Sequence, residues 1–225
     1  MSWIALGLLG GVVGLDATSF PQMMLSRPIV AGALVGLVLG HPAAGLLVGG
    51  VLEAFALVIL PFGAARYPES GTAAAAAAAA YIVASEATLD YRALLLTVVF
   101  ALAWEQIAGA SVVFTRRINE RLVRGPAGDG RLPAALVERR HLLAMGIDFV
   151  RGSWAVLLGT MLGSLLLRLF DPIFGISGPI SVRLVTVAAA VMIASLIPLF
   201  GGLRERWLSL AAGVLCGLLL LMLLK

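Results

Sequence analysis

Charged residues are scarce in this chain, and their scarcity excludes most classes of soluble protein. Only 12% of the 225 residues are Asp, Glu, Lys or Arg, whereas 61% are hydrophobic, and the mean hydropathy is +1.05. A soluble domain of this size could not cover so much apolar surface with polar groups. Apolar runs close to the length that a bilayer core requires recur along the chain. The sequence therefore predicts an all-α, polytopic integral membrane protein embedded in a lipid bilayer.

Cysteine and histidine are also rare in this chain. Cys216 is the one cysteine of the chain, so no intrachain disulfide can form. Because it lies within an apolar run, we expect a buried, inert thiol. The two histidines, His41 and His141, have no carboxylate partner nearby in the sequence, and no serine–histidine or metal-ligand pattern occurs. These absences argue against a membrane-embedded enzyme, and they predict no catalytic residues, no metal and no cofactor.

A separate soluble domain is also missing, so the sequence contains no candidate ATPase, kinase or phosphocarrier unit. The longest polar stretch, residues 116–140, carries seven arginines against three acidic residues. By the positive-inside rule this loop is cytoplasmic. The net charge of +4 is therefore a signal of membrane topology and does not indicate binding to nucleic acid. We expect an N-terminal membrane half at 1–115, a basic cytoplasmic loop at 116–140 and a C-terminal membrane half at 141–225.

The apolar segments of the N-terminal half are short and interrupted. Segments 29–40 and 43–60 are separated around Pro42, which cannot continue a helix without cost. They form either a hairpin of half-helices or one kinked span. In transporters, broken helices commonly frame the substrate site. We therefore predict broken or re-entrant helices in this half, and close packing against another helix for the eight alanines at 73–80.

Ionisable residues inside apolar segments are functional candidates because each is costly in a bilayer unless it is paired or hydrated. Asp148 and Arg151 are three residues apart and are predicted to form a local, structural ion pair on one helix. Glu105 either lines a polar path or forms a hydrogen bond between helices, and we favour the second interpretation.

Glu53 is the strongest candidate for a ligand-binding carboxylate. Gly45 and Gly49 precede it by eight and four residues, so all three share one helix face. Small residues at this spacing mark the close approach of two helices, which places Glu53 in a seam away from lipid. The polar turn with Glu69 and Ser70 follows. A carboxylate beside such a turn suits a neutral, polyhydroxylated solute, and a purely structural interhelical hydrogen bond is the alternative.

An ordered set of residues covers about a quarter of the chain between Asp16 and Thr72. Its elements are Asp16, Gln22, "SRP" at 26–28, "LVGLVLG" at 34–40, "GLLVGGVLE" at 45–53 and "LPFGAARYPES" at 60–70. In this order they resemble the signature region of enzyme IIC of the mannose–fructose–sorbose family of the bacterial phosphotransferase system.

The resemblance implies a permease subunit of the bacterial inner membrane that pairs with a IID membrane subunit and imports a hexose or an amino sugar. Cytoplasmic IIA and IIB subunits would relay phosphate to the arriving sugar, so the chain itself would be a transporter subunit without catalytic residues. The resemblance places six residues at the sugar: Asp16, Gln22, Arg27, Glu53, Glu69 and Ser70.

Two other functions are compatible with the sequence. A substrate-binding membrane subunit of an ATP-driven importer of vitamins or metal ions would also be small, apolar and dependent on partner chains. A permease remnant with a regulatory role would share the same features. Neighbouring genes distinguish the sugar permease from the ATP-driven importer, since genes for IIA, IIB and IID favour the sugar system and an ATPase gene favours the importer.

Overall fold

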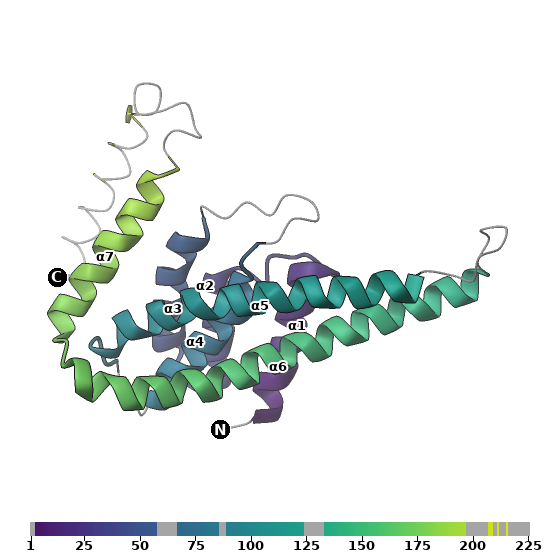
Figure 1. The fold of residues 1–225 in the computed structure, drawn as a ribbon. Helices are drawn as coiled ribbons and strands as arrows, with labels where there is room; N and C mark the ends of the chain where they lie inside the picture. Colours follow the sequence, from purple (N-terminus) through teal and green to yellow (C-terminus); the bar gives the residue numbers. More distant parts are fainter. Residues whose placement is uncertain are drawn as a thin grey trace.

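The computed structural model describes residues 3–57, 67–85, 89–123 and 133–196, with isolated positions near the C-terminus. Within these residues the chain folds into helices and contains no strand, which confirms the predicted all-α class (Figure 1). The helices are α1 (Trp3–Thr18), α2 (Pro28–Val38), α3 (Pro42–Ala56), α4 (Ser70–Ala84), α5 (Ala93–Val123), α6 (Ala134–Phe174) and α7 (Gly178–Ala194). Cys216 and the centre of the basic loop lie outside the described residues.

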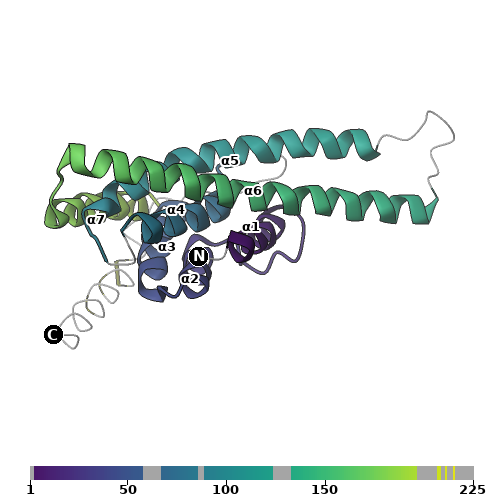
Figure 2. The ribbon, with the colours of Figure 1, turned by 90° about the horizontal axis from the view of Figure 1, so that it is seen from below.

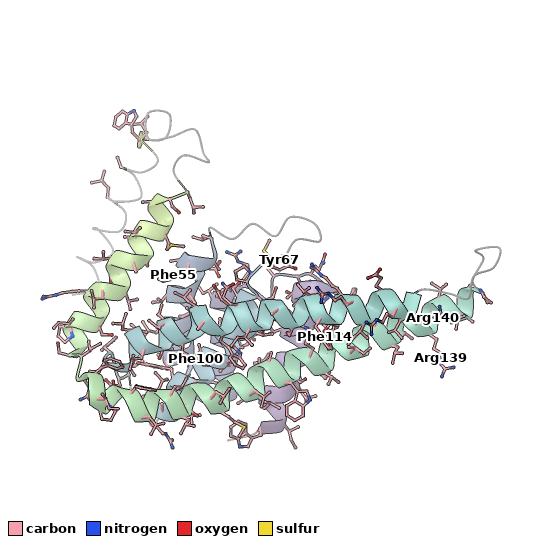
Figure 3. All side chains as sticks on the ribbon, in the orientation of Figure 1. Phe55, Tyr67, Phe100, Phe114, Arg139 and Arg140 are labelled. Carbon is pink, nitrogen blue, oxygen red and sulfur yellow. The ribbon has the colours of Figure 1, made fainter. Side chains whose placement is uncertain are left out.

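In the described part of the chain, two helices are long and apolar enough to cross a membrane. They are α5, with 31 residues, and α6, with 41. At roughly 1.5 Å per residue, α6 is about 60 Å long, about twice the thickness of a bilayer core. The two helices lie side by side, and their connected ends project away from the other helices (Figures 1 and 2). Arg139 and Arg140 lie at this projecting end (Figure 3).

The other helices have only 11 to 17 residues, fewer than the roughly 20 that a simple span needs. Helices α2 and α3 pack closely on each other, so the interrupted segments form a hairpin and not one kinked span. Gly40 makes the turn with a φ of +77°, a conformation that glycine adopts at little cost. Pro42 opens α3 at a position where its missing N–H is harmless.

Helix α4 forms the centre of the molecule. It packs against α2, α3, α5 and α6, between the hairpin and the two long helices (Figure 2). The eight alanines at 73–80 are all buried, which confirms the predicted close packing. The partner helix α6 presents Gly159 and Gly163 to Ala76 and Ala80. With no side chain on either glycine, the two helix backbones can approach closely.

Candidate functional site

A cleft of about 140 Å³ lies where the start of α4 meets the segment before α2. It is lined by Ala17 at the end of α1, by Ser26 and Arg27, by Ala56 at the end of α3, and by residues 67–71. Two motifs that are about forty residues apart in the sequence, "SRP" and "YPES", therefore contribute to the walls of one cleft.

Two contacts position the segment before α4. Gly71 lies so close to Ser26 that an added Cβ would be only 2.9 Å from the Ser26 Cα, so a larger residue has no room there. On the other side, the amide of Glu69 donates a hydrogen bond to the carbonyl of Glu105 at 3.0 Å. The segment before α4 is thereby fixed between α2 and α5. Glu105 itself is buried on α5.

Arg27 reaches the cleft from the N-terminus of α2 and is paired with Glu53 in the last turn of α3. Its Nε donates to Oε1 of Glu53 at 2.8 Å, and its Nη2 contacts the same oxygen. The amide of Ile29 donates to the other carboxylate oxygen at 3.2 Å. Glu53 thus closes the open end of the α2–α3 hairpin, and it is Arg27, not Glu53, that lines the cleft.

Glu69 is held by the second arginine of the site. Its side chain is 1% exposed, and its carboxylate accepts hydrogen bonds from Nη1 of Arg151 at 2.7 Å and from Nη2 at 3.4 Å. Asp148 lies on the other side of the same guanidinium at 3.5 Å and accepts a hydrogen bond from the Ser19 hydroxyl at 2.6 Å. The predicted pair of Asp148 and Arg151 is present, but the shorter contact of Arg151 is to Glu69.

Asp16 organises the turn between α1 and α2. Its carboxylate, 3% exposed, accepts hydrogen bonds from the amide of Met23 at 2.6 Å and from the amide and hydroxyl of Ser26, both at 2.8 Å. Gln22 lies exposed on this turn with a φ of 58° and is not among the residues that line the cleft. Ser70, the first residue of α4, does line it.

Sequence reasoning missed two residues of the site. Tyr67 lines the cleft and lies against α5 (Figure 3). Arg116 of α5 donates from Nη2 to the Tyr67 hydroxyl at 3.2 Å, and its guanidinium carbon lies 5.4 Å from the centre of the tyrosine ring. Arg116 flanks an apolar run, so in the sequence it was a topology signal, and nothing there linked it to a residue 49 positions earlier.

The cleft offers hydrogen-bonding groups of both kinds. Ser26, Ser70 and Tyr67 contribute hydroxyls, and Arg27 contributes N–H donors. Glu69 also lines the cleft, but its side chain is 1% exposed and both its carboxylate oxygens accept hydrogen bonds from Arg151. The charges of Arg27 and Glu69 are each neutralised by an ion pair, so the cleft suits a neutral, polyhydroxylated ligand better than an ion. In the described residues no group of His, Cys, Asp or Glu is placed to hold a metal ion.

Comparisons with known proteins agree with this architecture. A sorbose-specific IIC component of the phosphotransferase system from Klebsiella pneumoniae is 26% identical over 151 residues, which are 66% of this chain and 53% of the relative. A protein of the same description from Lacticaseibacillus casei is 32% identical over 83 residues, 37% of this chain and 30% of the relative. The chain thus matches about half or less of the length of these curated relatives.

Two further matches cover more of the chain. A solved structure described only as a membrane protein has a TM-score of 0.68 at 17% identity, covering 99% of this chain and 94% of that chain, which supports a shared fold. The family model for the sorbose-specific IIC component of the phosphotransferase system matches residues 1–170. The chain therefore belongs to the family of sorbose-specific IIC components of the phosphotransferase system.

Proposed function

We propose that this chain is the IIC permease subunit of a phosphoenolpyruvate-dependent sugar phosphotransferase system. It binds a hexose or an amino sugar in the cleft between Arg27 and residues 67–71 and moves it across the bacterial inner membrane. The observation that carries the proposal is that the two motif segments, both within the part matched to the IIC family, form the walls of one neutral, hydroxyl-rich cleft.

In this proposal the six predicted residues divide into three groups. Arg27, Glu69 and Ser70 line the cleft, where Arg27 and Ser70 are placed to touch the sugar and Glu69 would first have to release Arg151. Glu53 and Asp16 act through their neighbours, since Glu53 fixes Arg27 and Asp16 fixes Ser26. Gln22 lies on the turn that Asp16 holds, and its contact with sugar would require a movement of that turn.

The proposed partners supply what the chain lacks. A IID membrane subunit completes the permease, and cytoplasmic IIA and IIB subunits phosphorylate the sugar as it arrives. The basic, projecting end of α5 and α6, near Arg139 and Arg140, lies on the cytoplasmic side of this multi-pass subunit, where it can meet the IIB subunit (Figure 3).

Uptake in a host that lacks its own sugar phosphotransferase permeases tests the proposal. The chain should support uptake of a radiolabelled hexose or amino sugar when it is expressed with its IIA, IIB and IID partners, and the label should appear inside the cell as a sugar phosphate. The chain expressed alone should give no uptake above the empty vector. Robust uptake by the lone chain, or accumulation of unmodified sugar that depends on an ATPase, would contradict the proposal.

A further inference from the structure

Two further cavities lie at the other end of α5 and α6, away from the basic projecting end. An apolar groove of about 360 Å³ runs between the two helices. Leu96, Val99 and Ala103 line it from α5, residues between Leu166 and Phe174 line it from α6, and all its lining residues are apolar. A polar pocket of about 220 Å³ adjoins it.

The polar pocket contains charges of both signs. Its lining includes Asp90, Arg168 and Asp171, and Leu167 contributes to both the pocket and the groove. Pocket and groove are therefore two parts of one amphipathic depression. They lie at the same level along α6, and along α5 the groove extends further into the apolar segment, from Leu96 to Ala103.

Two of these charged side chains, Arg168 and Asp171, have hydrogen-bonding atoms that the described residues do not use. Asp90 is committed to Arg92, whose Nε and Nη2 donate to its carboxylate at 3.1 and 3.4 Å. Arg168 uses one Nη2 donor on the carbonyl of Val83 at 2.9 Å. Asp171 lies three residues further along α6; Arg92 interacts with its carboxylate electrostatically, but no described residue forms a hydrogen bond or an ion pair within 4 Å with it. A cation and an anion thus lie one helical turn apart without pairing.

The position of these charges along the helices matches the depth of lipid headgroups. The apolar part of α5 begins after Arg92, and the apolar run of α6 ends before Arg168. Charged side chains at the ends of membrane-spanning segments lie at the interface, while the residues between them lie in the hydrocarbon region. The pocket is therefore at headgroup level, and the part of the groove that follows α5 from Leu96 to Ala103 is at acyl-chain level.

We propose that this depression binds one zwitterionic phospholipid with a primary ammonium, of the phosphatidylethanolamine type. Arg168 donates to the phosphate, Asp171 accepts from the ammonium, and one acyl chain lies in the groove. The groove alone cannot select a lipid, because acyl chains are as apolar as its leucines. Selectivity comes from the two charges, since charge-assisted hydrogen bonds require an anion and an N–H donor at the matching spacing.

The headgroup chemistry predicts an order of affinity. Phosphatidylglycerol offers the phosphate without the ammonium, and phosphatidylcholine offers a cation without N–H donors. Both should bind more weakly than phosphatidylethanolamine. This site is separate from the sugar cleft, so the proposal holds or fails independently of the proposed transport function.

Native mass spectrometry of the full chain, purified in mild detergent and supplied with each of the three lipids, tests the proposal. We expect one tightly retained phosphatidylethanolamine per chain. Arg168→Gln and Asp171→Asn should each lower its retained fraction by about tenfold, the loss expected for one charge-assisted contact. Arg183→Gln is the matched control, because Arg183 is an exposed arginine on α7 outside the depression, and it should change nothing.

A second variant tests the groove without altering the charges. Ala103 is exposed and lines the groove, so Ala103→Phe fills the groove and leaves the core packing intact. It should displace the lipid while the amount of folded protein stays unchanged. Equal retention of the three lipids, unaltered retention in the two charge variants, or a partner-subunit helix seated in the groove in the assembled complex would each overturn the proposal.

Discussion

Arg151 is the residue on which most of the buried charge of the site depends. Its side chain is 7% exposed, and it separates two carboxylates, Glu69 and Asp148, that are themselves almost fully buried. Its Nη2 also lies 3.4 Å from the carbonyl of Gly14, so the guanidinium joins α1 and α6 to the segment before α4. A buried ion pair is costly to break because the remaining charge loses its partner away from water.

Arg151→Met should therefore be severely destabilising. It leaves two buried carboxylates without a cation, for which a loss of about 3–5 kcal/mol in the free energy of unfolding is typical. Arg151→Lys keeps the charge but loses the forked geometry, so its loss should be smaller. Thermal unfolding of the purified protein, followed by tryptophan fluorescence, measures both.

The double variant Arg151→Met with Glu69→Gln is the control for this prediction. Because it removes one of the two orphaned charges, it should be more stable than Arg151→Met alone. If the double variant is the less stable of the two, the contact between Arg151 and Glu69 does not account for the loss.

Glu53→Gln separates two roles for the carboxylate at the end of the α2–α3 hairpin. The amide keeps the shape but cannot neutralise Arg27, whose hydrogen bonds to it weaken from charge-assisted to ordinary ones, roughly 1.5–3 against about 1 kcal/mol each. Since Arg27 lines the cleft, the affinity for sugar should fall by about tenfold. Equilibrium sugar binding and the yield of assembled complex are measured together.

The two readings differ in which of these quantities changes. The pair is partly exposed, with Arg27 at 36% and Glu53 at 18%, so its contribution to stability is small and the yield should be near that of the wild type. Reduced yield with unaltered affinity would mean that the carboxylate only joins the two helices.

At the level of elements, glycine spacing in the sequence correctly predicted a close contact between two helices. Gly45 and Gly49 of α3 face Gly32 of α2, and Glu53 lies at the end of the same seam. The polyalanine helix was predictable for the same reason, since residues with little or no side chain allow backbones to approach. The hairpin itself was one of two alternatives, because Pro42 permits either a turn or a kink.

Substitutions along α3 test the seam directly. In Gly45→Ala the new Cβ would lie 2.6 Å from the Cα of Gly36, so the helices must separate, at a cost of about 1–3 kcal/mol typical of overpacking. Gly50→Ala lies on the same helix with nothing within 4 Å of its Cβ, and helix propensity favours it by up to about 1 kcal/mol.

The midpoint of thermal unfolding should accordingly fall for Gly45→Ala and stay equal or rise for Gly50→Ala. Equal effects of the two substitutions would exclude the seam as their cause and point to glycine content alone.

The candidate site was only partly predictable, for a physical reason. The motif residues Arg27, Glu69 and Ser70 could be named because they belong to the ordered motifs that resemble the signature region of the IIC family. Their partners could not, because Glu69 meets Arg151 from 82 positions away and Tyr67 meets Arg116 from 49. Such contacts depend on how α4 packs between the hairpin and the long helices, and one-dimensional spacing carries no record of that packing.

On the scale of the whole molecule, the two long helices set the axis along which function is arranged. Their connected ends carry the arginine-rich segment, and the opposite ends carry the charged pocket beside the apolar groove. The candidate cleft lies between these levels, against α5 at Tyr67 and Glu69. The arginine excess at 116–140 thus predicts more than the position of one loop, because it orients every other site relative to the membrane.

This orientation is testable with single cysteines in a Cys216→Ser background, which removes the one native thiol. Gly128→Cys, in the centre of the basic loop, should be shielded from an impermeant maleimide added to intact cells and should react once the cells are opened. Ser177→Cys is the matched control, because Ser177 is exposed at the turn between α6 and α7, at the end of α6 opposite the basic loop. It should react from outside in intact cells. Labelling of the two positions in the reverse order would invert the topology. The arginine-rich ends would then face outward, away from any cytoplasmic IIB subunit, and the phospholipid site would lie in the inner leaflet.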